Sequence, residues 1–417
     1  MKKYIYIITF LLSSIFCNKI LIPMDLSQTN HLKAYGVVFW NLKQGNEVDW
    51  LLNFKGGSFL MESTDSIKNE CIVRGVQFKN ISVNEYSQIL SLISENNMDI
   101  ALLETVPKIA VYSPPGKQPW DDAVTLALTY AEVEYDVIFD EEVLNGGLAK
   151  YDWLHLHHED FTGQYGKFYK NYRNKAWYKN MESEFNLTAS KFGFNSVHNL
   201  KKNIASIIKN YVQKGGFLFA MCSATDSFDI ALSALDCDIA HSVFDGTPID
   251  HNCKNKLNYD NTFAFEKFEL ITDPLTYEYS NIDIPQSHKP IARGAEEDYF
   301  SLFEFSAKWD PVPTMLTQNH VGIVKGFMGQ TTAFNRDYLK EQVVILGQVE
   351  GSNIVKYIHN NIGKGSFTFL GGHDPEDYRH MVGDPPTDLS LHRNSPGYRL
   401  ILNNILFPSA KKKKRKT

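Results

Sequence analysis

The sequence is poor in cysteine and in long apolar segments, and both deficits narrow its class. Five cysteines among 417 residues are too few for a disulfide-stabilised scaffold. No two of them have the Cys-x-x-Cys spacing of a structural zinc site. After the first 17 residues, no apolar stretch approaches the roughly 18 residues that a membrane-spanning helix needs. A globular α/β enzyme or binding protein therefore remains the expected class.

Basic residues are also scarce outside the two ends of the chain. Eight of the 42 lysines and arginines are Lys2, Lys3 and six residues of the tail 410–417, which leaves 34 against 48 acidic residues elsewhere. A groove for nucleic acid needs clustered basic side chains, so nucleic acid is not an expected partner. Contact with a membrane is expected only through the basic tail or through lipidation.

The first 17 residues have the pattern of an export signal. Two lysines precede a 14-residue apolar run from Tyr4 to Cys17, which is too short to span a bilayer. The pattern predicts a signal peptide over 1–17 and a periplasmic or secreted mature chain. Lipidation of Cys17 is the less favoured alternative, because Phe16 is bulkier than the usual preceding residue. Export leaves four cysteines, which permit two disulfides of undetermined pairing: Cys71, Cys222, Cys237 and Cys253.

Strands and helices alternate from residue 108 onward. Strands are predicted at 108–113, 135–140, 151–157, 217–222, 343–346 and 364–370, and helices at 119–133, 197–213, 228–235 and 396–406. Such alternation indicates a mainly parallel sheet with helices on both faces, in which the first four strands are neighbours. The main domain is assigned to 108–409, with polar insertions at 161–196 and 238–297.

The opening module, 18–107, has a less regular pattern. It combines a strand at 20–23, a helix at 30–44, strand-like residues at 48–59 and an amphipathic helix at 83–97. Two arrangements remain open, in which the module flanks the main sheet or forms a separate small α/β lobe.

Cys222 stands where a buried strand runs directly into a helix. A sharp strand-to-helix turn exposes the side chain and directs helix amides toward it, which suits a nucleophile. Alanines at 220 and 224 replace the two glycines of the usual nucleophile elbow. The alternative is a small buried hydrophobic residue that ends a strand.

His373 follows another predicted strand, in the segment GGHDPED. A histidine with nearby acids at a strand end suits a general base and its orienting carboxylate. Because parallel strands share one carboxyl edge, Cys222 and His373 are expected to face one cleft. Glu376, or failing it Asp374, is expected to accept the second ring N–H of His373. The alternative is a turn with solvated acids.

His155 and His157 lie on one face of the predicted strand 151–157 and are expected to reach the same cleft. Together with His158, Glu159 and Asp160, which follow at the carboxyl end of the strand, this pair suits a divalent metal or a polarised substrate carbonyl, and the alternative is a hydrogen-bonded strand end. The order of histidines and acids differs from metallo-hydrolase patterns, so neither a metal nor another cofactor is expected. His155, His157, Asp226 and Asp374 are assigned to substrate binding.

Three segments carry a family resemblance: GGFLFAMCSATDSF, GKGSFTFLGGHDPEDY and PGYRLILNNILFPSA. They resemble the trehalose-utilisation (ThuA-like) branch of the class I glutamine amidotransferase-like superfamily. The resemblance implies a flavodoxin-like doubly wound sheet over 108–409, with Cys222, His373 and Glu376 as the catalytic set. That branch usually has histidine at the Cys222 position. True glutamine amidotransferases have His-Pro-Glu where this sequence has one extra residue, Asp374.

The whole chain is also similar to exported bacterial proteins that carry the name asparagine synthetase B. The shared segments are ILIPMDLSQTNHLKAYG, EVDWLLNFKGGSF, FEFSAKWDPVPTMLTQNH and GFMGQTTAF. Asparagine synthetases have a cysteine directly after Met1 and a Ser-Gly-Gly-x-Asp-Ser loop for ATP. This sequence has Lys2 and lacks the loop. The name therefore implies no mechanism for this chain.

Two functions are expected from these features. The first is an exported Cys/His hydrolase or transferase that acts on an amide or a sugar derivative. The second is a non-catalytic module on the same fold that binds a small molecule, a carbohydrate or a peptide. Aromatic residues suit sugar stacking under either function: Trp153, Trp177, Tyr165, Phe168 and Tyr172.

Overall fold

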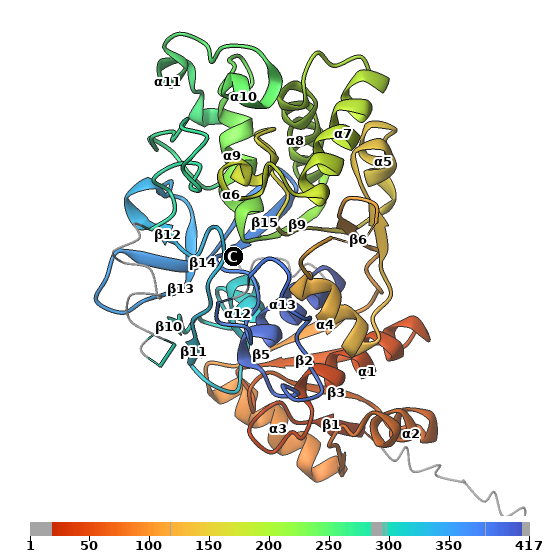
Figure 1. Ribbon diagram of the computed structural model, residues 1–417. Helices are drawn as coiled ribbons and strands as arrows, with labels where there is room; N and C mark the ends of the chain where they lie inside the picture. The colour runs from red at the N-terminus through yellow and green to blue at the C-terminus, as the bar shows by residue number, and fades with distance from the viewer. Residues whose placement is uncertain (1–18, 117, 285–294, 297, 380, 411–417) are drawn as a thin grey trace, which may run out of the picture.

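The computed structural model describes residues 19–410 except 117, 285–294, 297 and 380 (Figure 1). The predicted export signal with Cys17, and residues 411–417 of the basic tail, lie outside the described residues. Within the described part, the strands form one sheet of five strands and one of ten. None of the described helices is long and apolar enough to cross a bilayer.

The larger sheet has a parallel half that carries the predicted alternation. Its strands are β6 (Ile109–Tyr112), β7 (Asp136–Ile138), β8 (Trp153–Leu156), β9 (Phe217–Met221) and β15 (Gly365–Leu370). They lie in the order β7-β6-β8-β9-β15, and every neighbouring pair is parallel. The prediction that the first four strands are parallel neighbours is confirmed.

The other half of this sheet is antiparallel, so the sheet is mixed. A hairpin joins β14 (Ile354–Ile362) to β15 and reverses the strand direction. The sheet then continues through β13 (Val344–Gln348), β10 (Tyr299–Leu302) and β11 (Ile323–Lys325), and β12 (Phe334–Asn335) pairs with β14. The expectation of a mainly parallel sheet is therefore correct only for the half that follows the strand–helix alternation.

Helices cover both faces of the parallel half. Alternate strand residues enter two separate cores, with Trp153 and Phe219 in one and Leu154 and Leu218 in the other. The first core is shared with α4 (Ala123–Ala131) and α13 (Pro396–Leu406), and the second with α8 (Val197–Lys214) and α9 (Ser223–Ser233). This is the layered arrangement that the alternation predicts.

The opening module forms an antiparallel sheet of its own. Its strand order is β4-β1-β3-β2-β5, built from β1 (Lys19–Ile22), β2 (Val48–Leu52), β3 (Ser58–Glu62), β4 (Lys79–Ile81) and β5 (Asp99–Leu103). Helix α1 (His31–Lys43) contacts both α4 and α13, which cover the main sheet. The module is thus a separate sheet that shares a hydrophobic core with the main domain.

A buried arginine joins the module to the main domain. Arg399 on α13 donates to the carbonyl oxygens of Gly56 at 2.8 Å and Met24 at 3.0 Å. It also meets His320 Nδ1 at 3.1 Å, and His320 stacks on His31 with ring centroids 4.2 Å apart. The positive charge of Arg399 is therefore stabilised by the dipoles of backbone carbonyls.

The remaining helices include α3 (Val83–Glu95), which confirms the amphipathic helix predicted at 83–97. The others lie outside the helices predicted above and are α2 (Asp65–Arg74), α5 (Asp140–Leu144), α6 (Tyr169–Tyr172), α7 (Ala176–Lys191), α10 (Ser242–Asp245), α11 (Cys253–Lys256) and α12 (Pro311–Thr317). The four described cysteines are all free and buried, so neither permitted disulfide is formed.

Candidate active site

Three parallel strands end at one edge of the main sheet, and the loops that follow them are tied together. The Cys222 amide after β9 donates to the Gly372 carbonyl after β15 at 3.1 Å. The Ala224 amide donates to the His157 carbonyl after β8, also at 3.1 Å. These bonds hold Cys222 and His373 on the wall of one cleft of about 390 Å³, as the sequence predicts. We call it the Cys222 cleft.

Cys222 occupies a strained turn between β9 and α9. Its backbone angles are φ 51° and ψ −139°, a region that residues other than glycine rarely adopt. The helix begins at the next residue, Ser223, so the turn is completed within one residue. The sequence predicts the strand-to-helix junction, but places the start of the helix five residues later. This is the backbone geometry that an exposed nucleophile needs, obtained here without the flanking glycines.

The surroundings of the Cys222 thiol contain several amide groups. Sγ accepts a hydrogen bond from the Gln330 amide at 3.2 Å. Burial raises the pKa of Cys222 to about 11, and the amides of Gln330, Thr331 and Ser223 partly offset that rise. The resting side chain is therefore a neutral thiol at neutral pH. Any nucleophilic reaction requires a base to remove its proton.

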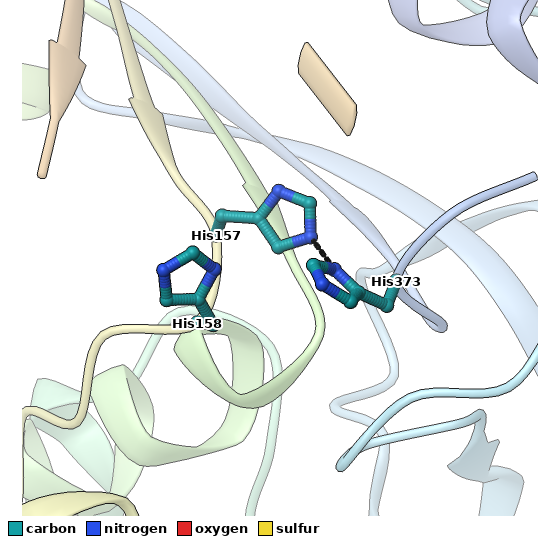
Figure 2. Close-up of side chains that lie close together, drawn as sticks. All are labelled: His157, His158 and His373. Carbon is teal, nitrogen blue, oxygen red and sulfur yellow. Dashed lines mark hydrogen bonds between the residues drawn. The ribbon is translucent and has the colours of Figure 1, made fainter. Parts of the chain in front are cut away.

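His373 is positioned by a second histidine rather than by an acid from its own loop. Figure 2 shows the ring of His157 directed at the ring of His373, with a hydrogen bond between Nε2 of His157 and Nδ1 of His373. The His373 amide donates to the Met328 carbonyl at 2.8 Å, which fixes the backbone beneath the ring. Both rings are almost fully buried.

Asp122 lies behind these histidines and was not singled out as a site residue by the sequence. Its Oδ1 accepts the Thr125 amide at 2.8 Å and so caps α4. Its Oδ2 lies 3.4 Å from His157 Nδ1 and 3.3 Å from His155 Nε2. Burial opposes ionisation of Asp122, but the two histidines outweigh it and hold the pKa of this carboxyl well below its usual value. Asp122 is therefore a buried carboxylate.

This arrangement prepares His373 to act as a base. With the proton of His157 on Nδ1, where it faces Asp122 Oδ2 at 3.4 Å, Nε2 of His157 accepts Nδ1–H from His373. That leaves Nε2 of His373 with a lone pair. Burial lowers the pKa of His157, but Asp122 and the neighbouring acids raise it above its usual value overall. Positive charge that develops on His373 is thus stabilised through His157 by Asp122.

The predictions for Glu376 and Asp374 are wrong in geometry. The Glu376 carboxylate lies 2.9 Å from His392 Nδ1 and faces a different hollow of the surface. Asp374 accepts the Glu376 amide and the Thr387 hydroxyl, both at 2.8 Å, and so organises its own turn. The ring of His373 is instead hydrogen-bonded to the ring of His157. The ring of His157, with Asp122 from the loop after β6 behind it, takes the position that was expected for an acid.

His155, His157 and Asp226, assigned to substrate binding, lie beneath the cleft rather than on its wall. His155 is fully buried, and its Nδ1 lies 3.1 Å from the Phe219 carbonyl. Asp226 in the first turn of α9 accepts the Thr331 hydroxyl at 2.8 Å. Burial raises the pKa of Asp226 to about 8. His157 and Asp226 bond to the segments beside Cys222, since the His157 carbonyl accepts the Ala224 amide and Asp226 accepts the Thr331 hydroxyl.

The wall of the Cys222 cleft is largely aromatic. Phe168 and Tyr172 line it as the sequence suggests, whereas Trp153 and Tyr165 belong to the core. His158, from the predicted histidine cluster, also lines the cleft, and the other lining residues among those described were not predicted: Trp120, Asn171, Tyr277, Met328, Gly329, Gln330, Arg379, Met381 and Val382. The indole N–H of Trp120 donates to Nε2 of His158. His158 and Glu159 adjoin the predicted pair, and that run of histidines was the available signal.

Two groups of side chains at this edge have the spacing of metal ligands. His157, His158 and His373 form one group, and Asp122, His155 and His157 form the other. In each group, one ligand atom from every residue lies within 4.8 Å of the others. The first group borders the Cys222 cleft through His158 and His373.

Comparison with known proteins gives little further guidance. No protein-family model matches the sequence, and no curated protein matches it. Among solved structures, the chain is similar to the cytoplasmic protein STM3548 from Salmonella typhimurium, with 10% identity, a TM-score of 0.36, and coverage of 74% of this chain and 100% of that one. It is also similar to the cytoplasmic protein STM1381 from Salmonella typhimurium LT2, with 12% identity, a TM-score of 0.33, and coverage of 73% and 100%.

A β-galactosidase from Bacillus circulans sp. alkalophilus is similar as well, with 11% identity and a TM-score of 0.27. The match covers 70% of this chain and 32% of the β-galactosidase. All three TM-scores lie below 0.5, so these similarities decide neither the fold family nor the activity.

Proposed function

We propose that the protein is a cysteine-dependent hydrolase or transferase that acts on an amide or a sugar derivative in the Cys222 cleft. One observation carries the proposal: a thiol on a strained strand-to-helix turn shares a cleft with a histidine that a buried carboxylate supports through a second histidine. A residue that merely ended a strand would not need this backbone geometry.

In the proposed reaction, Nε2 of His373 removes the Sγ proton of Cys222. Sγ then forms a bond to the carbonyl carbon of the substrate, and the amides around Sγ stabilise the negative oxygen. His373 returns the proton to the leaving amine as the C–N bond breaks. Water completes hydrolysis of the thioester, and a different acceptor in place of water gives transfer. Asp122 and His157 position His373 throughout.

The fold proposed for this domain is flavodoxin-like, as in the class I glutamine amidotransferase-like superfamily and its ThuA-like branch. The order β7-β6-β8-β9-β15 supports it, because along the chain this reads second, first, third, fourth, fifth. The placement of Cys222 and His373 after the fourth and fifth strands supports it too. The antiparallel half and the opening module are additions to that arrangement.

A mass-spectrometric trapping experiment tests the activity. The full chain is incubated with a panel of simple amides and amidated sugars, and both ammonia release and acyl adducts on Cys222 are measured. We expect ammonia release that Cys222→Ser and His373→Asn reduce by about 10³-fold or more, with an adduct on Cys222 only. Ammonia release that Cys222→Ser retains would contradict the proposal.

A non-catalytic binding module is the second candidate, and the aromatic wall of the cleft favours it. Trp120, Phe168, Tyr172 and Tyr277 offer ring faces on which a carbohydrate can stack. In this case Trp120→Ala abolishes retention on a carbohydrate array, whereas Cys222→Ser leaves it unchanged. The same array measurement with both variants separates the two candidates.

Export also belongs to the proposal. The signal-like residues 1–17 support a periplasmic or secreted enzyme. Amino-terminal sequencing of the protein from its native host tests it. We expect a mature chain that begins near Asn18 or Lys19, and a product that retains Met1 would contradict export.

A further inference from the structure

Three histidine rings converge beside the Cys222 cleft, and the thiol reaction uses only one of them directly. One ring nitrogen from each of His157, His158 and His373 lies within 4.8 Å of the others. Ligand atoms around a four-coordinate zinc ion, at bond lengths of about 2.1 Å, lie roughly 3.4 Å apart. Small side-chain movements therefore bring the three nitrogens to bonding distance of a common ion.

The surroundings of His157 match those of a metal-ligating histidine. Its Nε2 faces His373, while its Nδ1 faces the buried carboxylate of Asp122 at 3.4 Å. Metal-bound histidines commonly donate their second ring N–H to such a carboxylate, which fixes the ring and strengthens the ligand. His155 lies 3.3 Å from the same carboxylate oxygen and holds it from the other side. The negative charge of Asp122 also offsets that of a bound cation.

We propose that His157, His158 and His373 bind one divalent transition-metal ion of the zinc class, with its fourth position open to the Cys222 cleft. Three neutral imidazoles select such ions over magnesium and calcium, which prefer oxygen ligands. The indole N–H of Trp120 donates to Nε2 of His158, so the ion would take Nδ1 of His158, on the side of the ring that faces His157 and His373 in Figure 2.

The metal site goes beyond the proposed thiol chemistry. A histidine that ligates through Nδ1 carries its proton on Nε2, so a metal-bound His373 is no longer a base. Metal-bound and thiol-active forms are then mutually exclusive states of one cleft. Cys222 is not in the ligand group, so metal binding and thiol activity can fail independently.

Calorimetric titration of the chelator-treated full chain with Zn²⁺ tests the site. We expect one ion per chain, at least tenfold weaker binding in His158→Gln and His373→Gln, and 10- to 100-fold weaker binding in Asp122→Asn. Asparagine still caps a helix, so Asp122→Asn removes the charge while it preserves the start of α4. Titration with Co²⁺ supplies a second readout through the absorption bands of a four-coordinate ion.

Two variants serve as controls. His359→Gln changes a buried histidine on β14, outside either ligand group, and should leave Zn²⁺ binding unchanged. Cys222→Ser should also retain binding while it loses the proposed activity. Zn²⁺ binding that persists unchanged in both His158→Gln and Asp122→Asn would overturn the metal site, as would a wild-type chain that binds no more Zn²⁺ than His373→Gln.

Discussion

The parallel half of the main sheet and the opening module use buried polar groups in opposite ways. In the parallel half, strands β8, β9 and β15 all end at one edge, where His157 and Cys222 directly follow β8 and β9 and His373 lies three residues after β15. In the opening module the strands are antiparallel, so successive strands end at opposite edges. Two of its carbonyl groups, those of Met24 and Gly56, instead join it to the main domain at Arg399.

This difference explains why the candidate catalytic residues lie at the edge of the main sheet and not in the sheet of the opening module. Parallel strands separated by helices bring residues far apart in the sequence to a single edge, as with Cys222 and His373. The opening module has a comparable core but no such convergence among its described residues. It contributes stability through α1, which packs against the helices that cover the main sheet.

The largest effect is expected from breaking the junction between these regions. Arg399→Met leaves the carbonyls of Met24 and Gly56 without their guanidinium donor in a buried place. We expect a loss of about 3–5 kcal/mol in the free energy of unfolding, measured by urea denaturation. Arg393→Met, on the exposed surface just before α13, is the matched control and should change it by less than about 0.5 kcal/mol. Equal midpoints for the two variants would show that the junction is not needed for stability.

A smaller effect is expected in the reactivity of a thiol from each region. Burial raises the pKa of Cys71 on α2 to about 12 and that of Cys222 to about 11, where backbone amides partly compensate. The reactive thiolate forms above these values, so alkylation of both thiols should still accelerate well above pH 9. At any one pH below 11, Cys222 should react with iodoacetamide at least tenfold faster than Cys71.

Peptide mapping by mass spectrometry after brief labelling at several pH values measures this ratio. Cys71 is fully buried, whereas Cys222 lines the cleft, and access therefore adds to the difference. Faster labelling of Cys71 would mean that the cleft does not admit the reagent.

The same comparison shows what the sequence can predict. The strand–helix rhythm predicts the parallel half, and with it the meeting of Cys222 and His373, because strand direction alone fixes which loops share an edge. It does not predict the role of Asp122. In the sequence this residue has the pattern of a helix cap, which uses one carboxylate oxygen, and only the fold brings the other oxygen to the histidines. Glu376 is close to His373 in sequence but is turned toward His392, a contact that depends on a loop far along the chain.

The antiparallel additions were harder to predict for a different reason. Strands β10, β11 and β12 have two to four residues each, too few to show a period, and they lie in a segment rich in polar and turn-forming residues. Their positions are set by pairing with β13 and β14, which only the folded chain supplies.

The smallest expected effect concerns the strain at the centre of the site. At φ 51° and ψ −139°, any residue with a Cβ is strained by about 1–3 kcal/mol, whereas glycine adopts this region readily. Cys222→Ala and Cys222→Gly remove the same thiol and differ only in that Cβ. The greater freedom of glycine in the unfolded chain lowers the free energy of unfolding by about 0.5–1 kcal/mol. The Cys222→Gly chain should therefore be more stable than the Cys222→Ala chain by about 1 kcal/mol, measured as the difference in urea midpoints at constant slope.

Position 220 on β9 supplies the control. There, glycine should be less stable than the native alanine, because that strand residue has no such strain. If alanine proved the more stable residue at position 222 as well, the turn would hold no strain, and the backbone argument for a nucleophile there would fail.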